Sequence, residues 1–584
     1  MLPLIAAIGY GYGHGHGHGH GQGTPAKNQK TTAAAVGLSR GRTMKQLAVA
    51  LACALTVLAC GSPSPAPEAG PGGAATARGG TVVIGLLSDV QSWNPYLAED
   101  SATANLLALV YPSLAVEQAD YHLHPPSFEP ALARSWVWSD DGLVLELELD
   151  PRARWSDGVP ITSRDVVFTW QAQVSPEVGW LFAAAKDGID GVEAVDEHTV
   201  RVRFNRVDPY QLMDLNDGLI IPAHAWAGIP FDSWREVAWR ERVVAGGPFS
   251  LAGHTPQQEI VLERNPGYFR PGLPRLDRAV FRIVPSDRGL VTQLLAGELD
   301  FVRSVPPADV DRVRADDDLE LVVYDDRSYT HICWNTARPR LADPRVRRAL
   351  TMAIDRETLV DVVYAGFVRM AVGPVLSSFW AFNQDLEPLP FDPEAARALL
   401  ADAGWRDRDG DGIVERDGVP LALELLAPAE NELRQDIALL VQEDLRRVGV
   451  EARPRFLEWG TLLAALDGGD FDGMVNLWEE PTRIDLAEVW HSPPADGASL
   501  NFGRYSNPEV DRLLAEVAEL AEFPDRKPLL DRIQALIVAD QPYTFLVENV
   551  RLTAHSARLR GAEINAATPY FNMDEWAVAP AGAE

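Results

Sequence analysis

The stretch from residue 130 to residue 168 reads PALARSWVWSDDGLVLELELDPRARWSDGVPITSRDVVF. Within it, residues 143–149 alternate apolar and acidic side chains, which is the period of a strand with one exposed face. Asp-Gly pairs at 141–142 and 157–158 are turn signals between strands. From Ser163 onward, polar capping residues precede an apolar run, which predicts the start of a helix. The stretch therefore predicts strands, turns and a helix in close succession.

A mixture of strands and helices continues on both sides of this stretch. A β-rich run covers 80–87, and Asp343-Pro344 suits the start of a helix, with Asp as N-cap and Pro at the first helical position. Helical spacing is clearest at 346–363, 393–403, 432–448, 508–520 and 526–538. Further strands are predicted at 279–284, 319–324, 331–335, 421–427 and 544–547. Elements that alternate over this length predict α/β lobes rather than a helical bundle or a β-propeller.

The N-terminal region is typical of an export signal followed by a tether. Residues 44–59 combine a short basic start with an apolar run, which predicts a lipoprotein signal peptide. The run ends in VLACGS at 57–62, which resembles a bacterial lipobox and implies cleavage before Cys60 and acylation of that residue. An ordinary signal cut nearby, or a retained anchor, is the alternative. Residues 60–79, rich in Pro, Ala, Gly and Ser, predict a flexible tether.

Residues 1–43 precede this signal and are interpreted as an upstream, non-native start region. They contain a Gly-His alternation that includes His14, His16, His18 and His20. Imidazoles on a flexible chain can gather around a transition metal, so metal binding is the competing interpretation.

Of the three cysteines, Cys53 lies inside the signal and Cys60 at the lipobox, which leaves Cys333 as the lone thiol of the mature chain. A lone thiol forms no internal disulfide, so the fold has to depend on its core. Cys333 stands in the apolar stretch 329–334, where we expect a buried small hydrophobe rather than a nucleophile.

Size and charge narrow the function classes. About 500 residues follow the tether, which by length alone predicts two or three domains. The formal net charge is -31 and the pI about 4.8, which argues against nucleic acid as a partner because phosphates require a basic surface. We find no apolar run after the signal that is long enough for a transmembrane helix.

Several segments together resemble the extracytoplasmic solute-binding proteins of the peptide/nickel transport family (bacterial family 5). The most specific block is the stretch quoted above, because its residues and their spacing are hard to obtain by chance. The other matching segments are GGTV at 79–82, WNP at 93–95, VY at 110–111, GGPF at 246–249, LERNPGYF at 262–269, GELD at 297–300, Asn335, DPRVRRAL at 343–350, AID at 353–355, DP at 392–393, ALL at 398–400 and AGW at 403–405. The resemblance covers about 80–559.

The resemblance implies an α/β fold, namely the two-lobed clamp of type II periplasmic binding proteins with an extra subdomain in the first lobe. Ligand would lie buried between lobes that close about two crossover strands, and the closed shape would be recognised by a permease. The implied domains are lobe I at 80–116 and 246–323, the extra subdomain at 117–245, lobe II at 324–545, and a return to lobe I with the C-terminal tail at 546–584.

For peptide ligands the family pairs with the ligand's backbone and holds its α-amine with a carboxylate shortly after a Trp of the second lobe. The corresponding stretch here is LWEEPTRID at 477–485, with Pro481 where peptide-binding members most often carry Asp. Glu479, Glu480 and Asp485 are alternatives for that charge. Arg483 can bind a carboxylate of the ligand bidentately. A surface loop with mutual salt bridges is the competing interpretation. The candidate ligand-binding residues are Trp478, Glu479, Glu480, Arg483 and Asp485.

Three further residues are candidates for ligand contact. Glu99 and Ser101 follow Asn94-Pro95 at the spacing where some oligopeptide binders meet their ligand, with a solvated turn before a helix as the alternative. Trp380 stands among aromatic and small residues, where it either covers an apolar part of the ligand or packs into the core.

Asp407, Asp409 and Asp411 with Gly412 resemble the start of a calcium loop. Position 12 of such a loop is Gly418, so the bidentate Glu of an EF-hand is missing. We therefore favour a plain turn over a calcium site.

These observations predict a non-catalytic receptor, outside the cytoplasm in the periplasm or at the cell surface, that delivers peptides to an ABC transporter. HExxH, GxSxG and P-loop motifs and Cys/His clusters at metal spacing are missing from the sequence, so no enzyme activity, cofactor or metal is predicted. Expected partners are the permease subunits and, through the lipid anchor only, a membrane; the chain is expected to be a monomer. Pro481 motivates the alternative of an oligosaccharide, opine-like compound or metal chelate as ligand. The acidic clusters motivate a more remote one, an extracellular hydrolase.

Overall fold

The computed structural model describes residues 79–494 and 499–579, so the expectations for residues 1–78, including Cys60, lie outside the described residues. The largest sheet has the strand order β17-β16-β18-β12-β19-β11-β1-β10-β9-β8, with β13 beside β19. Its strands are β1 (Thr81–Leu86), β8 (Phe249–Thr255), β9 (Glu259–Arg264), β10 (Arg278–Ile283), β11 (Phe301–Val302), β12 (Leu319–Trp334), β13 (Val368–Met370), β16 (Ala422–Pro428), β17 (Glu451–Leu457), β18 (Gly473–Glu479) and β19 (Tyr543–Ser556).

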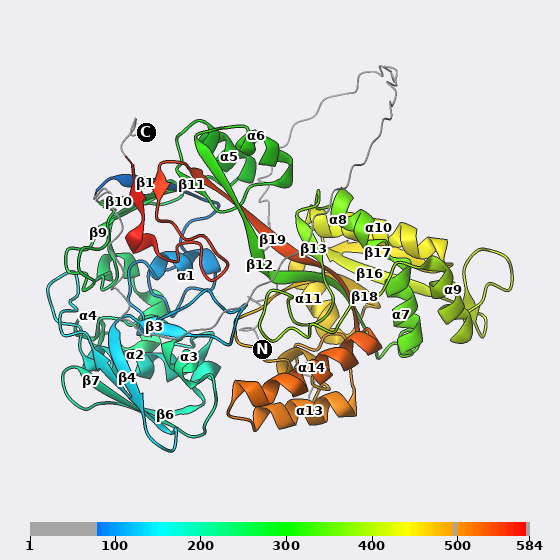
Figure 1. Cartoon of the computed structure of the whole chain (residues 1–584), viewed down its shortest axis with the longest axis horizontal. Coiled ribbons are helices and arrows are strands. Elements are labelled where there is room, and N and C mark those ends of the chain that lie inside the picture. Colours follow the sequence, from blue (N-terminus) through cyan, green and yellow to red (C-terminus); the bar gives the residue numbers. More distant parts are fainter. Residues whose placement is uncertain (1–78, 495–498, 580–584) are drawn as a thin grey trace, which may run out of the picture. The chain divides into compact units, whose positions relative to one another are not determined.

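Two long strands, β12 and β19, cross from one half of this sheet to the other (Figure 1). Their first pairing, from Leu319 with Ser556 to Asp325 with Val550, lies beside β11 of the first lobe. After a register shift, the pairing resumes at Tyr329 and continues beside β18 of the second lobe. The predicted strands 319–324 and 331–335 are therefore one strand, and the predicted strand 544–547 is much longer.

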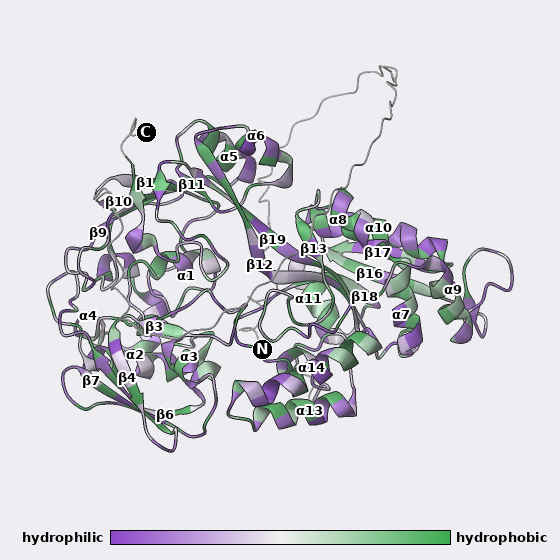
Figure 2. Cartoon of the chain, viewed as in Figure 1, coloured by the Kyte–Doolittle hydropathy of each residue, from purple (hydrophilic) through white to green (hydrophobic). Residues whose placement is uncertain are grey.

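The link between the two predicted halves of β12 covers residues 325–330 and begins with the four polar residues DDRS; hydrophilic residues are purple in Figure 2. Its charges are matched locally, because Arg551 Nη2 lies 2.5 Å from Asp326 Oδ2 and Arg369 Nη1 lies 2.8 Å from Asp325 Oδ2. A sequence pattern based on apolar side chains stops at this link. Pairing with β19 is also interrupted between Asp325 and Tyr329, but β12 itself continues as one strand. Both lobes are therefore joined by extended, hydrogen-bonded backbone, which gives the mixed α/β, two-lobed architecture that was predicted.

The extra subdomain contains the four-stranded sheet β4-β5-β7-β6 and the helix α2 (Ser163–Val174). The alternation predicted for 143–149 is confirmed, since Leu145, Leu147 and Leu149 are buried and the acidic residues between them are exposed. Gly142 has φ +69°, as the predicted Asp-Gly turn requires. The strands are β4 (Ala133–Trp138), β5 (Val144–Leu149), β6 (Ile189–Ala194) and β7 (Thr199–Phe204).

The helices of the second lobe follow the sequence pattern closely, with one break. Asp343 caps α7 by accepting a hydrogen bond from the backbone N–H of Arg345, as predicted. The single helix predicted at 346–363 is wrong, because Ile354 is extended and Asp355 caps a new helix by accepting from the Thr358 N–H. The helices are α7 (Pro344–Ala353), α8 (Arg356–Val362), α9 (Pro393–Asp402), α10 (Glu432–Arg447), α11 (Trp459–Gly468), α12 (Ala487–Trp490), α13 (Pro508–Ala518) and α14 (Phe523–Asp540).

The remaining elements cover the first lobe and connect it to the hinge strands. They include α1 (Ser101–Leu107), β2 (Ala115–Glu117), β3 (Phe128–Pro130), α3 (Gln211–Asn216), α4 (Ala223–Trp226), α5 (Asp287–Leu295), α6 (Val310–Arg314), β20 (Leu559–Arg560) and β21 (Ala577–Val578). A two-stranded hairpin, β14 (Glu415–Arg416) with β15 (Val419–Pro420), follows the acidic run in the second lobe. Within the described ranges, none of the helices has the length and apolar character needed to cross a bilayer.

Candidate functional site

The candidate residues of the second lobe lie where β18 ends. β18 runs parallel to β16 and antiparallel to β12, so its carboxyl end lies next to the start of the second-lobe part of β12. Glu479 is paired with Ser328, and the backbone N–H of Glu480 donates to Arg327 O at 2.7 Å. The carboxyl ends of parallel strands are where open α/β sheets bind their ligands. The end of β18 is thus placed at the edge where a ligand is expected.

Trp478 is buried among other aromatic rings. Its ring stacks with that of Phe502 at 6.3 Å between centroids, and its Nε1 donates to Tyr543 Oη at 3.4 Å. Only 3% of Trp478 is exposed. Trp478 is therefore a core residue near the end of β18, with little surface left for contact with a ligand.

Glu480 is a carboxyl group without a basic partner. Burial, and secondarily the charge of Glu488, raise its pKa to about 8. Part of its surface still reaches solvent, so it is a half-buried group at an edge rather than one sealed in the core. None of the ion pairs found among residues 79–494 and 499–579 involves it. A positive charge that binds next to Glu480 would therefore stabilise its ionised carboxylate.

Glu479, one residue earlier, has a more exposed side chain and a different electrostatic environment. Burial raises its pKa and the charge of Asp326 raises it further, while Arg551, Arg303 and Arg327 oppose the rise. Charges on the hinge strands, together with Arg303 after β11, therefore act on this carboxylate. The two consecutive acids differ, because the charge that acts on Glu480 is that of Glu488.

Arg483 is engaged by the protein itself. Its Nη2 lies 2.7 Å from Asp214 Oδ1, and its guanidinium lies 4.6 Å from the centre of the Tyr210 ring. Both partners belong to the extra subdomain, whereas Arg483 belongs to the second lobe. The predicted role in binding a ligand carboxylate would require Arg483 to exchange Asp214 for the ligand.

The same contact includes a second arginine, and we refer to Asp208, Tyr210, Asp214, Arg483 and Arg526 as the Tyr210 contact. Arg526 Nη2 lies 3.3 Å from Asp208 Oδ2, and the backbone N–H of Ile484 donates to Tyr210 Oη at 3.0 Å. Burial raises the pKa of Asp214 to about 6, although Arg483 opposes this rise. The Tyr210 contact therefore ties the extra subdomain to the second lobe through partly buried charges.

Asp485, Glu99 and Ser101 are exposed. Asp485 Oδ1 accepts a hydrogen bond from the Ala487 N–H at 3.0 Å, at the start of α12. Glu99 and Ser101 flank Asp100, whose side chain caps α1 by accepting from the Thr103 N–H. The structure joins neither Glu99 nor Ser101 to the acids at the end of β18.

Trp380 lies beside the Tyr210 contact. Its backbone N–H donates to Tyr121 O at 3.0 Å, and its ring meets that of Phe523 edge to face at 5.6 Å. Phe523 in turn packs on Tyr210, with 5.0 Å between ring centroids. Trp380 is thus part of the packing between the extra subdomain and the second lobe, and its buried indole N–H has no hydrogen-bond acceptor among the described residues.

Sequence reasoning missed a buried polar group beneath this region. Arg434 is 3% exposed, its Nη2 has no described acceptor, and burial lowers its pKa to about 10. His331 and Asn476 are directly opposite on β12 and β18, and both His331 ring nitrogens and Asn476 Oδ1 are also buried without described partners. Burial keeps the pKa of His331 well below its ordinary value. The available signal was that Arg434 lies three residues before Ile437, on the apolar face of α10.

Cys333 is buried, and burial raises the pKa of its thiol to about 12. The prediction that it packs as a small hydrophobe is therefore confirmed.

The acidic run forms a hydrogen-bonded turn. Asp407 accepts backbone hydrogen bonds from Gly410 at 2.7 Å and Gly412 at 3.0 Å. One carboxylate oxygen each of Asp407, Asp409 and Glu415 lie within 4.8 Å of one another, a group that does not include Asp411. The backbone bonds account for this loop without an ion.

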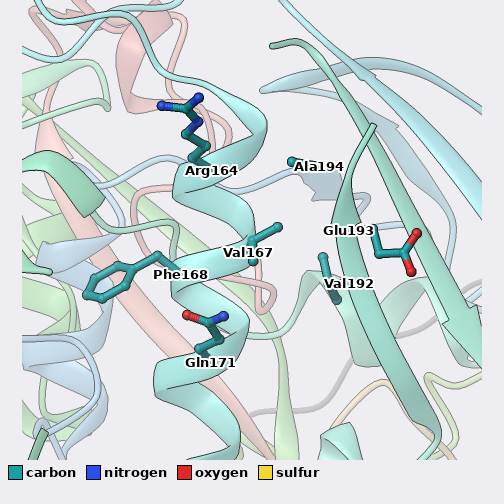
Figure 3. Close-up of a pocket in the computed structure, with 7 residues that line it drawn as sticks. All are labelled: Arg164, Val167, Phe168, Gln171, Val192, Glu193 and Ala194. Carbon is teal, nitrogen blue, oxygen red and sulfur yellow. The ribbon is translucent and has the colours of Figure 1, made fainter. Parts of the chain in front are cut away.

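Two hollows occur on the surface away from the end of β18. One, of about 390 Å³, lies between α2 and β6, and Figure 3 shows Arg164, Val167, Phe168 and Gln171 on the helix with Val192, Glu193 and Ala194 on the strand. The other, of about 310 Å³, is lined by Glu320 and Val322 of β12, by His555 of β19 and by residues 559–562 and 564. Neither hollow is lined by a candidate ligand-binding residue.

The chain is similar to several characterised proteins over most of its length. Oligopeptide-binding protein AppA of Bacillus subtilis (strain 168) is 29% identical over 505 residues, which cover 85% of this chain and 92% of AppA. Heme-binding protein A of Haemophilus influenzae is 26% identical over 454 residues, covering 74% and 81%. Glutathione-binding protein GsiB of Escherichia coli is 25% identical over 491 residues, covering 82% and 91%.

Solved structures agree on the fold. AppA from Bacillus subtilis in complex with a nonapeptide superposes with a TM-score of 0.71 at 28% identity, covering 86% of this chain and 100% of that chain. NikZ from Campylobacter jejuni in complex with Ni(L-His) gives a TM-score of 0.71 at 22% identity, covering 85% and 99%, which shows the fold alone. The family model described as "Bacterial extracellular solute-binding proteins, family 5 Middle" matches residues 127–482. The chain therefore belongs to family 5 of the bacterial extracellular solute-binding proteins.

Proposed function

We propose that this chain is a lipid-anchored receptor outside the cytoplasm that captures peptides between its two lobes and delivers them to an ABC importer. The observation that carries the peptide part is the likeness to AppA, whose structure holds a nonapeptide and is covered along its whole length. Lobes joined by two hinge strands suit this task, because a solute held between them ties the lobes together and favours the closed state.

The acids at the end of β18 support recognition of an amine. Glu480 has a raised pKa and no basic partner among the described residues, so an ammonium group of the ligand supplies the charge that its burial lacks. Glu479 and Asp485 are the alternatives.

A non-peptide solute is the second candidate. Pro481, where the peptide-binding pattern has Asp, favours it. A relative of similar length is named as binding haem, and a protein of the same fold is seen with Ni(L-His). The relatives named above are binding proteins, so we propose no catalysis.

Membrane attachment rests on Cys60 and its lipobox-like context, and the soluble part is proposed to act as a monomer beside the permease subunits. Two lipid chains on one residue suffice for stable anchoring, so no helix is required to cross the membrane.

A calorimetric binding screen tests the proposal. The full chain, washed free of bound solute by reversible denaturation, is titrated with peptides of two to nine residues, glutathione among them, and, separately, with haem and Ni(L-His). We expect saturable binding of peptides and recovery of each peptide unchanged. Binding of only the non-peptide compounds would refute the peptide part, and conversion of any ligand would refute the receptor role.

A further inference from the structure

One arginine of the first lobe is held in place by the hinge. Arg303 directly follows β11, which is parallel to β1 and antiparallel to β19. Its carbonyl oxygen accepts a hydrogen bond from Thr553 Oγ1 at 2.8 Å, and two residues later the Val305 N–H donates to Leu552 O at 2.7 Å. Thr553 and Leu552 both belong to β19, so the backbone on either side of Arg303 is fixed to a strand that continues into the second lobe.

The position of Arg303 mirrors that of Glu479. Arg303 stands just beyond the carboxyl end of a parallel strand in the first lobe, and Glu479 stands at the carboxyl end of a parallel strand in the second. Ligands of open α/β sheets bind in the crevice outside these ends. Since β12 and β19 connect the two sheet halves, both residues lie at ends of the same hinge.

The guanidinium of Arg303 is not paired with any described carboxylate. Its Nε is buried and has no acceptor, and none of the ion pairs within 79–494 and 499–579 involves it. The neighbouring charges are better matched, because Arg551 pairs with Asp326 at 2.5 Å and Arg327 Nε donates to Ala566 O at 3.0 Å. A guanidinium keeps its charge at all relevant pH values, so a buried donor without an acceptor is costly to the ligand-free protein.

The charge of Arg303 affects the pKa of groups in both lobes. Its charge opposes the burial-driven rise in the pKa of Glu479 in the second lobe and of Tyr570 in the first. Arg303 likewise opposes the burial-driven rise in the pKa of Tyr324, which lies on the hinge strand β12. The charge of Arg303 therefore acts on groups of both sheet halves.

We infer that Arg303 binds a carboxylate of the solute held between the lobes, so that the first lobe contributes the cation and the acidic end of β18 in the second lobe takes a positive group. This inference rests on the proposed function and adds the chemistry of the second ligand end. A planar guanidinium accepts a carboxylate through two parallel hydrogen bonds, which would satisfy the buried Nε. A ligand with both charges then bridges the lobes and stabilises closure.

Substitutions in the full chain separate charge from structure. Arg303→Gln removes the cation and Arg303→Lys keeps it without the bidentate geometry. Arg288→Gln is the matched control, since Arg288 is an exposed residue of α5 in the same lobe. The probes are an alanine-serine pentapeptide with a free C-terminal carboxylate, its C-terminal amide, and the amide with one alanine replaced by glutamate. Binding is measured by calorimetry and folding by the melting temperature.

We expect Arg303→Gln to weaken binding of the free acid roughly 10- to 100-fold and to leave the amide unchanged. The affinity of Arg303→Lys for the free acid should lie between those of Arg303→Gln and the wild type, and the affinity of Arg288→Gln should equal that of the wild type. Loss of affinity for the glutamate-bearing amide instead of the free acid would assign the carboxylate to a side chain. Equal effects on the free acid and the unsubstituted amide, or no effect on any probe, would overturn the inference.

If the wild type binds none of the pentapeptides, the proposed function fails in its peptide part and the inference is tested on whatever solute co-purifies. Native mass spectrometry of the wild type and of Arg303→Gln then decides, because a retained solute in a folded variant would overturn the role of Arg303. Its loss from Arg303→Gln but not from Arg288→Gln would support the role.

Discussion

Replacement of Glu480 by glutamine should stabilise the ligand-free protein at neutral pH and weaken ligand binding at the same time. The pKa of Glu480 is raised from its ordinary 4.5 to about 8, chiefly by burial. For a group with a raised folded pKa, its contribution to stability is complete below about pH 4.5 and is lost as the pH rises toward 8. At pH 7 the loss corresponds to about 3 kcal/mol at about 1.4 kcal/mol per pH unit.

Solvent screening reduces this figure, because Glu480 keeps part of its surface accessible. We therefore expect Glu480→Gln to raise the free energy of unfolding by about 1–2 kcal/mol at pH 7. For about 500 folded residues, with an unfolding entropy of about 2.1 cal/mol/K per residue, the melting temperature should rise by about 1–2 °C. Near pH 4.5 the variant and the wild type should melt together.

Thermal unfolding from pH 4.5 to 8.5 measures the first half of this prediction, with Glu387→Gln, an exposed residue of the second lobe, as the control. Calorimetry in two buffers of different ionisation enthalpy measures the second half. Wild type should release close to one proton at pH 7 when a ligand ammonium group binds, and Glu480→Gln should release none. A melting difference that does not grow between pH 4.5 and 8, or proton release that survives the substitution, would refute this reasoning.

Three further predictions follow from other parts of the chain. Arg483→Gln removes the cation that is paired with Asp214, whose pKa is raised to about 6 by burial. We expect a loss of about 1–2 kcal/mol of stability at pH 8 and a smaller loss at pH 5, where Asp214 is largely protonated. An equal loss at both pH values would contradict the pairing. Cys60→Ser should move the protein from the membrane fraction to the soluble fraction and abolish incorporation of labelled fatty acid, whereas unchanged fractionation would argue against a lipid anchor there. Millimolar calcium should leave the melting temperature unchanged, because the carboxylates of Asp407 and Glu415 already accept backbone hydrogen bonds; a rise that Asp407→Asn abolishes would show a calcium site.

Local patterns predicted most elements because they depend on neighbours in sequence. The alternation at 143–149 and the Asp343-Pro344 helix start describe interactions within a few residues, and both are confirmed. The same local logic failed at Asp355, where a capping side chain ends one helix and begins another within an apolar run. It also failed in the middle of β12, where one strand continues through four polar residues although its pairing with β19 shifts register there.

The candidate site could be predicted only in part, because its contacts join distant segments. The end of β18 was found from a family pattern, but the pairing of Arg483 with Asp214 spans 269 positions and has no local signal. The backbone of Arg303 is held by Thr553 from 250 residues away, so nothing near it in sequence shows that this residue lies beside the hinge. Glu99 and Ser101 were predicted from spacing alone, and spacing does not show which face of a turn meets a ligand.

The most direct test of the central claim is native mass spectrometry of the full chain purified from its own host without denaturation. We expect a stoichiometric mass increment that is released on unfolding and that fragments as one or more intact peptides. Capture of a sugar, haem or metal chelate in place of peptide would contradict peptide capture as the function of this chain.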